Sequence, residues 1–159
     1  MNYKYLLILL SLIIISCSNE EISPENLIFQ NGLAYLKNSE KLFTGFSVSN
    51  KNGKFIINYK EGQRDGLTKR YWTNSKLRLR ENYTNGKRNG LHEMFYANGN
   101  IEMKIYFLND KINGTAEWFH KNGNVSKTGI YENGNIIEIK CFEKDGKIYA
   151  PSPRGLCLN

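Results

Sequence analysis

Short runs of aromatic and aliphatic residues alternate with polar residues along most of the chain, and dipeptides typical of tight turns separate these runs. Between Gly90 and Asn109, two such runs flank the sequence Ala-Asn-Gly-Asn. Asn-Gly between two strand-like runs is the strongest short signal of a β-hairpin, because a type I′ turn needs positive φ at both central residues. The pattern therefore predicts consecutive antiparallel strands joined by short turns.

The turn positions also predict the register of each hairpin. If Asn98 and Gly99 occupy the two central turn positions, the residues on either side pair in a fixed order. Asn122 and Gly123 repeat the signal in the next unit, whereas Ser75 replaces the turn glycine in the unit before. The expected cross-strand pairs are Tyr96–Ile101, Met94–Met103, Glu93–Lys104, His120–Val125, Trp118–Lys127, Trp72–Leu77 and Arg70–Leu79.

Alternation along each strand then divides the residues between two faces of the sheet. The residues expected on one face are Trp72, Tyr96 and His120 with Leu77, Ile101 and Val125. The opposite face is expected to collect Tyr71, Phe95 and Phe119 with Arg78, Glu102 and Ser126. From this mixed aromatic and polar face we select Tyr71, Arg78, Phe95 and Phe119 as the candidate binding surface.

The pattern is an internal repeat. Units begin at Gly66, Gly90 and Gly114, 24 residues apart, with a shorter copy from Gly45 and a degenerate half-unit from Glu138. A lone hairpin is only marginally stable, so the units must stack. The predicted fold class is all-β, an elongated and twisted antiparallel sheet of stacked β-hairpins.

The repeat units resemble the variant MORN repeat of bacterial proteins over about residues 45–137. The matching positions are Tyr83, Gly86, Gly90, Leu91, Tyr96 and Gly99, followed by Gly114, Phe119, Gly123, Tyr131 and Gly134. Asp110 stands where one repeat expects glycine, and residues 32–45 resemble the usual lead-in. The resemblance implies a non-catalytic scaffold or lipid-contacting protein, and many such proteins are grouped as YwqK-type antitoxins.

The N-terminus resembles that of a bacterial lipoprotein. A basic start and an apolar run from Leu6 to Ile15 precede Ser16-Cys17, and the run is shorter than the roughly 20 residues that span a membrane. The sequence around Cys17 resembles a lipobox, which predicts a lipidated cysteine at the mature N-terminus. We therefore divide the chain into a signal peptide (1–16), a lipidated flexible tether (17–26), the repeats (27–140) and a C-terminal cap (141–159).

Location changes how the net charge of +7 is interpreted. A basic chain can bind nucleic acid or anionic membranes, but an exported lipoprotein does not meet nucleic acid in the cytosol. Ser18 after the lipidated cysteine favours the outer membrane, facing the periplasm or the cell surface. The expected partners are the membrane, through the lipid anchor, and a protein or glycan of the envelope.

The sequence offers few residues for catalysis or metal binding. Cys141 and Cys157 are the remaining cysteines of the mature chain, and an oxidising compartment favours a disulfide between them, which would secure the C-terminal cap. No close Cys or His spacing suggests a metal site. His92 and His120 lie within strand patterns and lack a triad or paired carboxylates. We expect a protein that is not an enzyme and needs no cofactor.

Three functions remain at this stage. The first is a binding or scaffold platform for an envelope protein or glycan. The second is an immunity or antitoxin-like protein that neutralises a toxin in the envelope, which rests on the family grouping alone. The third is an electrostatic membrane binder, whose binding to anionic lipid would weaken with salt.

Lipidation gives a direct test of the location. The Cys17→Ala variant is expected to remain an unlipidated precursor, and the protein should be lost from its normal membrane fraction, because no acyl chains anchor it. Fractionation with metabolic labelling by a radioactive fatty acid measures both effects. Full membrane retention of the unlabelled variant would contradict the lipoprotein assignment.

Overall fold

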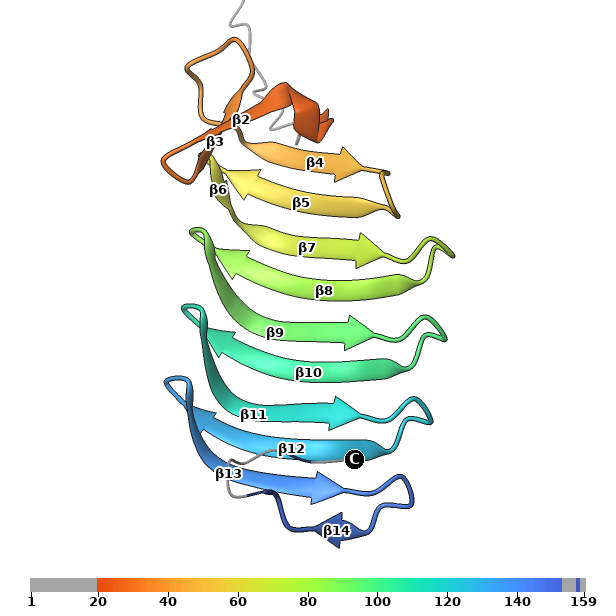
Figure 1. Ribbon diagram of the computed structural model, residues 1–159. Helices are drawn as coiled ribbons and strands as arrows, with labels where there is room; N and C mark the ends of the chain where they lie inside the picture. The colour runs from red at the N-terminus through yellow and green to blue at the C-terminus, as the bar shows by residue number, and fades with distance from the viewer. Residues whose placement is uncertain (1–19, 153–156, 158–159) are drawn as a thin grey trace, which may run out of the picture.

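The computed structural model describes residues 20–152 and Cys157 and is built almost wholly from β-strands (Figure 1). Predicted signal-peptide and lipidation residues, including Cys17, lie outside the described residues. A single 3-10 turn (Pro24–Asn26) follows the first strand, and no helix in the described part of the chain is long and apolar enough to cross a membrane. The strands are β1 (Glu20–Ile22), β2 (Leu27–Gln30), β3 (Leu33–Leu36), β4 (Gly45–Ser49), β5 (Phe55–Lys60), β6 (Gln63–Arg64), β7 (Gly66–Tyr71), β8 (Leu77–Thr84), β9 (Lys87–Phe95), β10 (Ile101–Leu108), β11 (Lys111–Phe119), β12 (Val125–Glu132), β13 (Asn135–Phe142) and β14 (Ile148–Tyr149).

One long sheet contains all strands except β2 and β3. Its strand order is β1-β4-β5-β7-β8-β9-β10-β11-β12-β13-β14, with β6 pairing to β5, so from β7 each strand lies beside the next in sequence. The pairs are antiparallel apart from β1 with β4. Figure 1 shows an elongated, twisted stack, which confirms the predicted fold class.

The tether assignment requires a correction at its C-terminal part. Residues 17–26 were expected to be flexible, but β1 within them pairs in parallel with β4. The physical reason is Ile22, whose apolar side chain packs against the buried cluster formed by Leu27, Ala34, Phe43, Ile57 and Tyr59. The β2–β3 hairpin belongs to this cluster and closes the N-terminal end of the sheet.

The predicted turn around Gly99 is wrong in type. Only Gly99 of the Asn98-Gly99 pair has positive φ (98°), and its N–H donates to the carbonyl of Tyr96 at 2.8 Å. The Tyr96 N–H in turn donates to the carbonyl of Asn100 at 2.9 Å, so the loop has three residues rather than two. A three-residue loop of this kind combines a type I-like turn with a bulge at the glycine.

The longer loop shifts the register beside the turn by one residue. Ile101 pairs with Phe95 rather than Tyr96, and the equivalent predictions His120–Val125 and Trp72–Leu77 are wrong in the same way. The observed pairs are Phe119–Val125 and Tyr71–Leu77. Farther from the turns the predictions are confirmed for Met94–Met103, Glu93–Lys104, Trp118–Lys127 and Arg70–Leu79.

Two-residue turns with positive φ at both centres occur at the other edge of the sheet. Asn85 (φ 49°) and Gly86 (φ 78°) join β8 to β9, and Asn133 (φ 52°) and Gly134 (φ 88°) join β12 to β13. Asp110 (φ 66°) takes the glycine position in the turn between β10 and β11. These φ values are those of type I′ turns, which the sequence had placed at the opposite edge.

Side chains at the three-residue turns bind each repeat to the next. Trp72 Nε1 donates to the carbonyl of Phe95 at 3.0 Å, and Tyr96 Oη donates to the carbonyl of Phe119 at 2.7 Å. His120 repeats the contact, with Nε2 3.1 Å from the carbonyl of Phe142. The turn asparagines form a second series of side-chain bonds to carbonyls, namely Asn74 to Ala97 (3.1 Å), Asn98 to Lys121 (3.2 Å) and Asn122 to Lys144 (3.4 Å).

The sheet ends at β14, and a disulfide links Cys157, farther along the chain, to β13. Pro151 follows shortly after β14, and proline has no N–H to donate to a strand ladder. Cys141 on β13 is fully buried and bonds to Cys157, with a Cα–Cα distance of 5.6 Å. The predicted disulfide is therefore present, and it attaches Cys157 to β13.

Ser75 gives a test of the three-residue turn. It has φ 63° at the position that Gly99 and Gly123 fill in later repeats, and a left-handed conformation costs a non-glycine residue about 1–2 kcal/mol. We expect Ser75→Gly to raise the free energy of unfolding by about 0.5 kcal/mol, because the extra chain entropy of glycine offsets part of the gain.

Urea unfolding followed by circular dichroism measures this change. The matched control is Gly99→Ser, which should lower stability by about 1 kcal/mol. A Cβ at residue 99 would meet only the side chain of Lys76 at 3.8 Å, so this cost is conformational rather than steric. A stabilised Gly99→Ser variant would contradict the assigned turn geometry.

Candidate functional site

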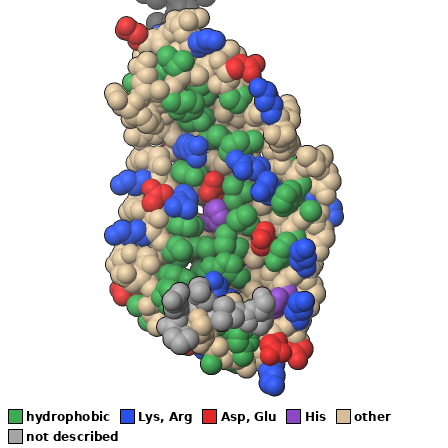
Figure 2. Space-filling model, in the orientation of Figure 1, with side chains coloured by type: hydrophobic (Ala, Val, Ile, Leu, Met, Phe, Trp, Pro, Cys, Tyr) green, Lys and Arg blue, Asp and Glu red, His purple; other side chains and the backbone are tan. Residues whose placement is uncertain are grey.

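One face of the sheet carries a continuous row of directly paired residues, which we call the apolar row. In order from β5 to β14 its members are Phe55, Arg70, Leu79, Met94, Met103, Trp118, Lys127, Cys141 and Tyr149. Directly paired residues point to the same side of a sheet, so the row defines one face, here named the apolar face. Figure 2 shows hydrophobic side chains gathered along the middle of this face, with basic side chains beside them.

Most of the apolar row is neither buried nor fully exposed. Leu79, Met94, Met103 and Trp118 are half-buried, because no second layer of strands or helices covers the middle strands among the described residues. Beside the row, Ile105, Phe107 and Ala116 form the one buried cluster of this region. The apolar face therefore offers a long surface of large, partly accessible side chains.

The central row of the opposite face is polar, although the exposed side chains of Tyr106 and Ile130 also lie on that face. Its central row runs through directly paired residues on β7 to β13, namely Lys69, Arg80, Glu93, Lys104, Glu117, Thr128 and Lys140. Glu93 is only 5% exposed, and its carboxylate accepts a hydrogen bond from Arg80 Nε at 2.6 Å. This face, which we call the charged face, differs from the apolar face in the composition of its central row.

Cations on the apolar face lie over aromatic rings. Arg70 lies 4.3 Å from the ring centroid of Phe55, Arg88 lies 4.1 Å from that of Phe107, and Lys127 Nζ lies 3.6 Å from that of Trp118. Each contact is within the distance of a cation–π interaction. The face therefore combines apolar area with positive charge that is held in place by the rings.

A chain of polar side chains crosses the same face beside the apolar row. His92 Nδ1 lies 3.0 Å from Glu81 Oε2, and since a carboxylate only accepts, Nδ1 carries the hydrogen. Tyr83 Oη donates to Glu81 Oε1 at 3.3 Å and accepts from Arg64 Nη1 at 3.3 Å. The His92 and Glu81 side chains are 12% and 10% exposed, so this pair is largely shielded from water.

Burial and pairing act in opposite directions on Glu81. Burial alone raises the pKa of its carboxyl group, but the hydrogen bond and charge of His92, helped by Tyr83 and Arg88, hold that pKa below its ordinary value of 4.5. Glu81 is therefore ionised in the folded protein at neutral pH. Its partner Thr68, directly across on β7, has a buried hydroxyl with no hydrogen-bond partner among the described residues.

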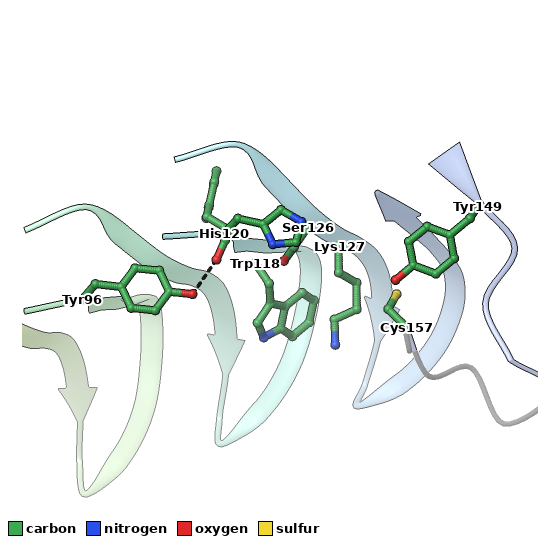
Figure 3. A pocket seen from close by; sticks show the side chains of 8 residues that line it. Tyr96, Trp118, His120, Ser126, Lys127, Tyr149 and Cys157 are labelled. Atoms are coloured by element: carbon green, nitrogen blue, oxygen red, sulfur yellow. Dashed lines mark hydrogen bonds between the residues drawn. The ribbon is translucent and has the colours of Figure 1, made fainter. Parts of the chain in front are cut away.

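A pocket of about 320 Å³ lies at the C-terminal end of the apolar face. Figure 3 shows the rings of Tyr96, Trp118 and Tyr149 around it, with Lys127 extending between the last two. The other described residues that line it are Phe119, His120, Ser126 and Cys157. The pocket thus combines aromatic walls with an ammonium group, an imidazole and hydroxyl groups. No group of three potential metal ligands occurs in the part of the chain that the structure describes.

The structure keeps three of the four candidate binding residues at equivalent positions and separates the fourth, Arg78, from them. Tyr71, Phe95 and Phe119 end β7, β9 and β11 at equivalent positions, and each pairs with the first residue of the next strand. Arg78 does not join them, because its guanidinium lies 4.2 Å from the ring centroid of Trp72. The one-residue bulge beside each turn causes this separation, since it changes which residues share a face.

Sequence reasoning did not assign the apolar row or the Glu81–His92 pair to a site. The Trp118–Lys127 pair was predicted, and both residues line the pocket. A lysine paired with a tryptophan instead of a carboxylate was the sequence signal that could have indicated this site. Glu81 and His92 lie 11 residues apart on adjacent strands, and their pairing depends on the bulged register of β8 and β9. Hairpin periodicity alone carries no indication of it.

The Glu81–His92 pair predicts a pH-dependent effect on stability. His92→Phe removes the hydrogen bond of the ring to a buried carboxylate, which keeps only the Tyr83 hydroxyl as a donor, and should lower the free energy of unfolding by about 3 kcal/mol near pH 7. In the wild-type protein, ionised Glu81 stabilises the fold at pH values above 4.5, the ordinary pKa that the carboxyl group has in the unfolded chain. This stabilisation is lost as the pH falls through the lower pKa that Glu81 has in the folded protein. In the variant, acid protonates the Glu81 carboxyl and removes the cost of burying its charge. The difference in free energy of unfolding between the wild type and the variant should therefore become smaller toward about pH 3.5.

Urea unfolding at both pH values tests this. In a Glu81→Gln background the same histidine substitution should cost less and lose this pH dependence, because no carboxylate remains to titrate. A gap that widens in acid would show that the pair does not stabilise the ionised carboxyl group.

Comparison with known proteins supports the repeat assignment. No curated protein matches the chain. A family model described as MORN repeat variant matches residues 64–85, 88–109 and 112–133, which have the same 24-residue period as the predicted units. The matches do not extend to residues 45–63 or beyond residue 133, where the structure continues the same sheet. The middle of the described sheet therefore contains three consecutive segments that match the MORN repeat variant.

Proposed function

We propose that this protein is a non-enzymatic lipoprotein of a bacterial envelope that uses the apolar face as a platform for binding an envelope protein or glycan. The observation that carries the proposal is the apolar row. Large side chains such as Met94, Met103 and Trp118 are half-buried, and no second layer covers them among the described residues. Apolar patches that stay accessible on soluble proteins commonly mark interaction sites.

The rigidity of the scaffold supports this role. Hydrogen bonds between successive turns hold the repeats in a fixed order, so a partner would meet a preformed surface and lose little affinity to ordering it. Cations held over rings, such as Arg70 on Phe55, add charge that can orient a partner without the cost of immobilising a free side chain.

The position of the expected tether is compatible with such a platform. β1 lies at one end of the sheet and β14 at the other, as Figure 1 shows. At about 4.8 Å per strand, the intervening strands extend about 50 Å. A lipid on Cys17 would hold the β1 end at the membrane and leave the rest of the apolar face available to other components of the envelope.

Neither histidine is assigned a catalytic role in this proposal. His92 Nδ1 donates to a buried carboxylate, and His120 Nε2 is bonded to a backbone carbonyl. Both rings therefore have structural contacts that account for their positions.

Site-specific crosslinking tests the platform. The full chain with a photoreactive residue at Met94 or Met103 should form a discrete adduct in native envelopes, and excess wild-type chain should compete for it. A chain carrying Met103→Glu should compete poorly, because a buried charge disfavours the same contact. The matched control places the photoreactive residue at Lys104, on the charged face.

Adducts that are equal at Met103 and Lys104, or that resist competition, would contradict binding through the apolar face. Circular dichroism of each variant establishes that the fold is retained.

A further inference from the structure

The pocket at the C-terminal end of the apolar face has an unusual charge balance. Lys127 lies over Trp118, and burial lowers the pKa of its ammonium group. None of the ion pairs among the described residues includes Lys127. The described residues place no carboxylate in ion-pair contact with this half-buried ammonium, so an anionic group entering the pocket would gain a charge-assisted hydrogen bond.

The polar groups around Lys127 suit hydroxyl groups of a ligand. His120 Nε2 is bonded to the Phe142 carbonyl, which only accepts, so in the neutral ring Nε2 carries the hydrogen and Nδ1 is left as an acceptor. The hydroxyls of Ser126 and Tyr149 make no hydrogen bond within the described residues. The two hydroxyls can donate to and accept from ligand hydroxyls, and Nδ1 of His120 can accept from them.

The walls of the pocket are aromatic, and its size is limited. The rings of Tyr96, Trp118 and Tyr149 surround the space, and Tyr96 is held in place by its bond to the Phe119 carbonyl (Figure 3). A volume of about 320 Å³ lies at the lower end of the range for ligand pockets, about 300–1,000 Å³. The space therefore fits one or two small rings whose C–H faces can pack against aromatic side chains.

We propose that this pocket binds a carboxylate-bearing sugar, a uronic acid residue of an anionic glycan, with the carboxylate at Lys127 and a face of the sugar ring on Trp118. A simple inorganic anion would leave the aromatic walls unused, and a neutral sugar would leave Lys127 without a counter-charge. This inference rests on the proposed function, since it names the ligand class of one part of the apolar face.

The test measures binding of a soluble galacturonic acid trimer to the full chain in detergent, by calorimetry. Its methyl ester, which has the same rings without the charges, is the matched ligand control. The ester should bind at least about tenfold more weakly, because one hydrogen bond to a charged group is worth about 1.5–3 kcal/mol.

Two lysine variants separate the pocket from general charge effects. Lys127→Met keeps an unbranched chain over Trp118 and should weaken trimer binding at least about tenfold. Lys69→Met is the matched control, because it removes a lysine from the charged face at a position that does not line the pocket. It should leave the affinity unchanged.

A second arm distinguishes a free glycan from a lipid-linked one. Vesicles of phosphatidylcholine containing a glucuronic acid glycolipid are compared with vesicles containing phosphatidylglycerol at equal charge. Lys127-dependent binding to the trimer or to the glycolipid supports the proposal and identifies the source. The proposal is overturned if vesicles with phosphatidylglycerol bind as well as those with the glycolipid, or if the methyl ester binds as well as the trimer. It is also overturned if neither the trimer nor the glycolipid vesicles bind. If apolar-face crosslinks persist in that case, only the ligand class fails and the platform remains.

Discussion

The structure depends on hydrogen bonds that connect each repeat to the next, because the sheet is a single layer over most of its described length. Only Ile105, Phe107 and Ala116 form a buried apolar cluster among the middle strands, which is far less than the core of a two-layer domain. Backbone ladders and turn contacts, such as Tyr96 to the Phe119 carbonyl, replace the missing layer. Stability is then shared between neighbouring units, as in other repeat proteins.

Because backbone and turn hydrogen bonds hold the sheet together, the side chains on its two faces can differ in chemical character. The charged face carries the row from Lys69 to Lys140, and the apolar face carries the apolar row with the pocket around Trp118 and Lys127. The buried Glu81–His92 pair also restricts the register, because a slip of one residue would turn Glu81 to the other face and leave its carboxylate without a partner. Scaffold and binding surface thus depend on the same strand pairing.

Much of the fold could be predicted from local signals. The 24-residue period, the strand content and the pairs farthest from the turns, such as Met94–Met103, follow from alternation and turn residues that lie within one unit. The disulfide between Cys141 and Cys157 followed from cysteine number and the expected compartment. The turn type was not predictable in this way, because Asn-Gly is compatible with both a two-residue and a three-residue loop.

The sequence by itself determined a stack of β-hairpins with a fixed repeat, because strand alternation and turn chemistry are properties of neighbouring residues. Only the tertiary structure decided which side chains share a face. The three-residue loop around Gly99 makes Phe95 rather than Tyr96 the partner of Ile101, and Tyr96 instead bonds to the Phe119 carbonyl of the next repeat. The apolar face and its pocket arise from these contacts between units, which no single repeat contains.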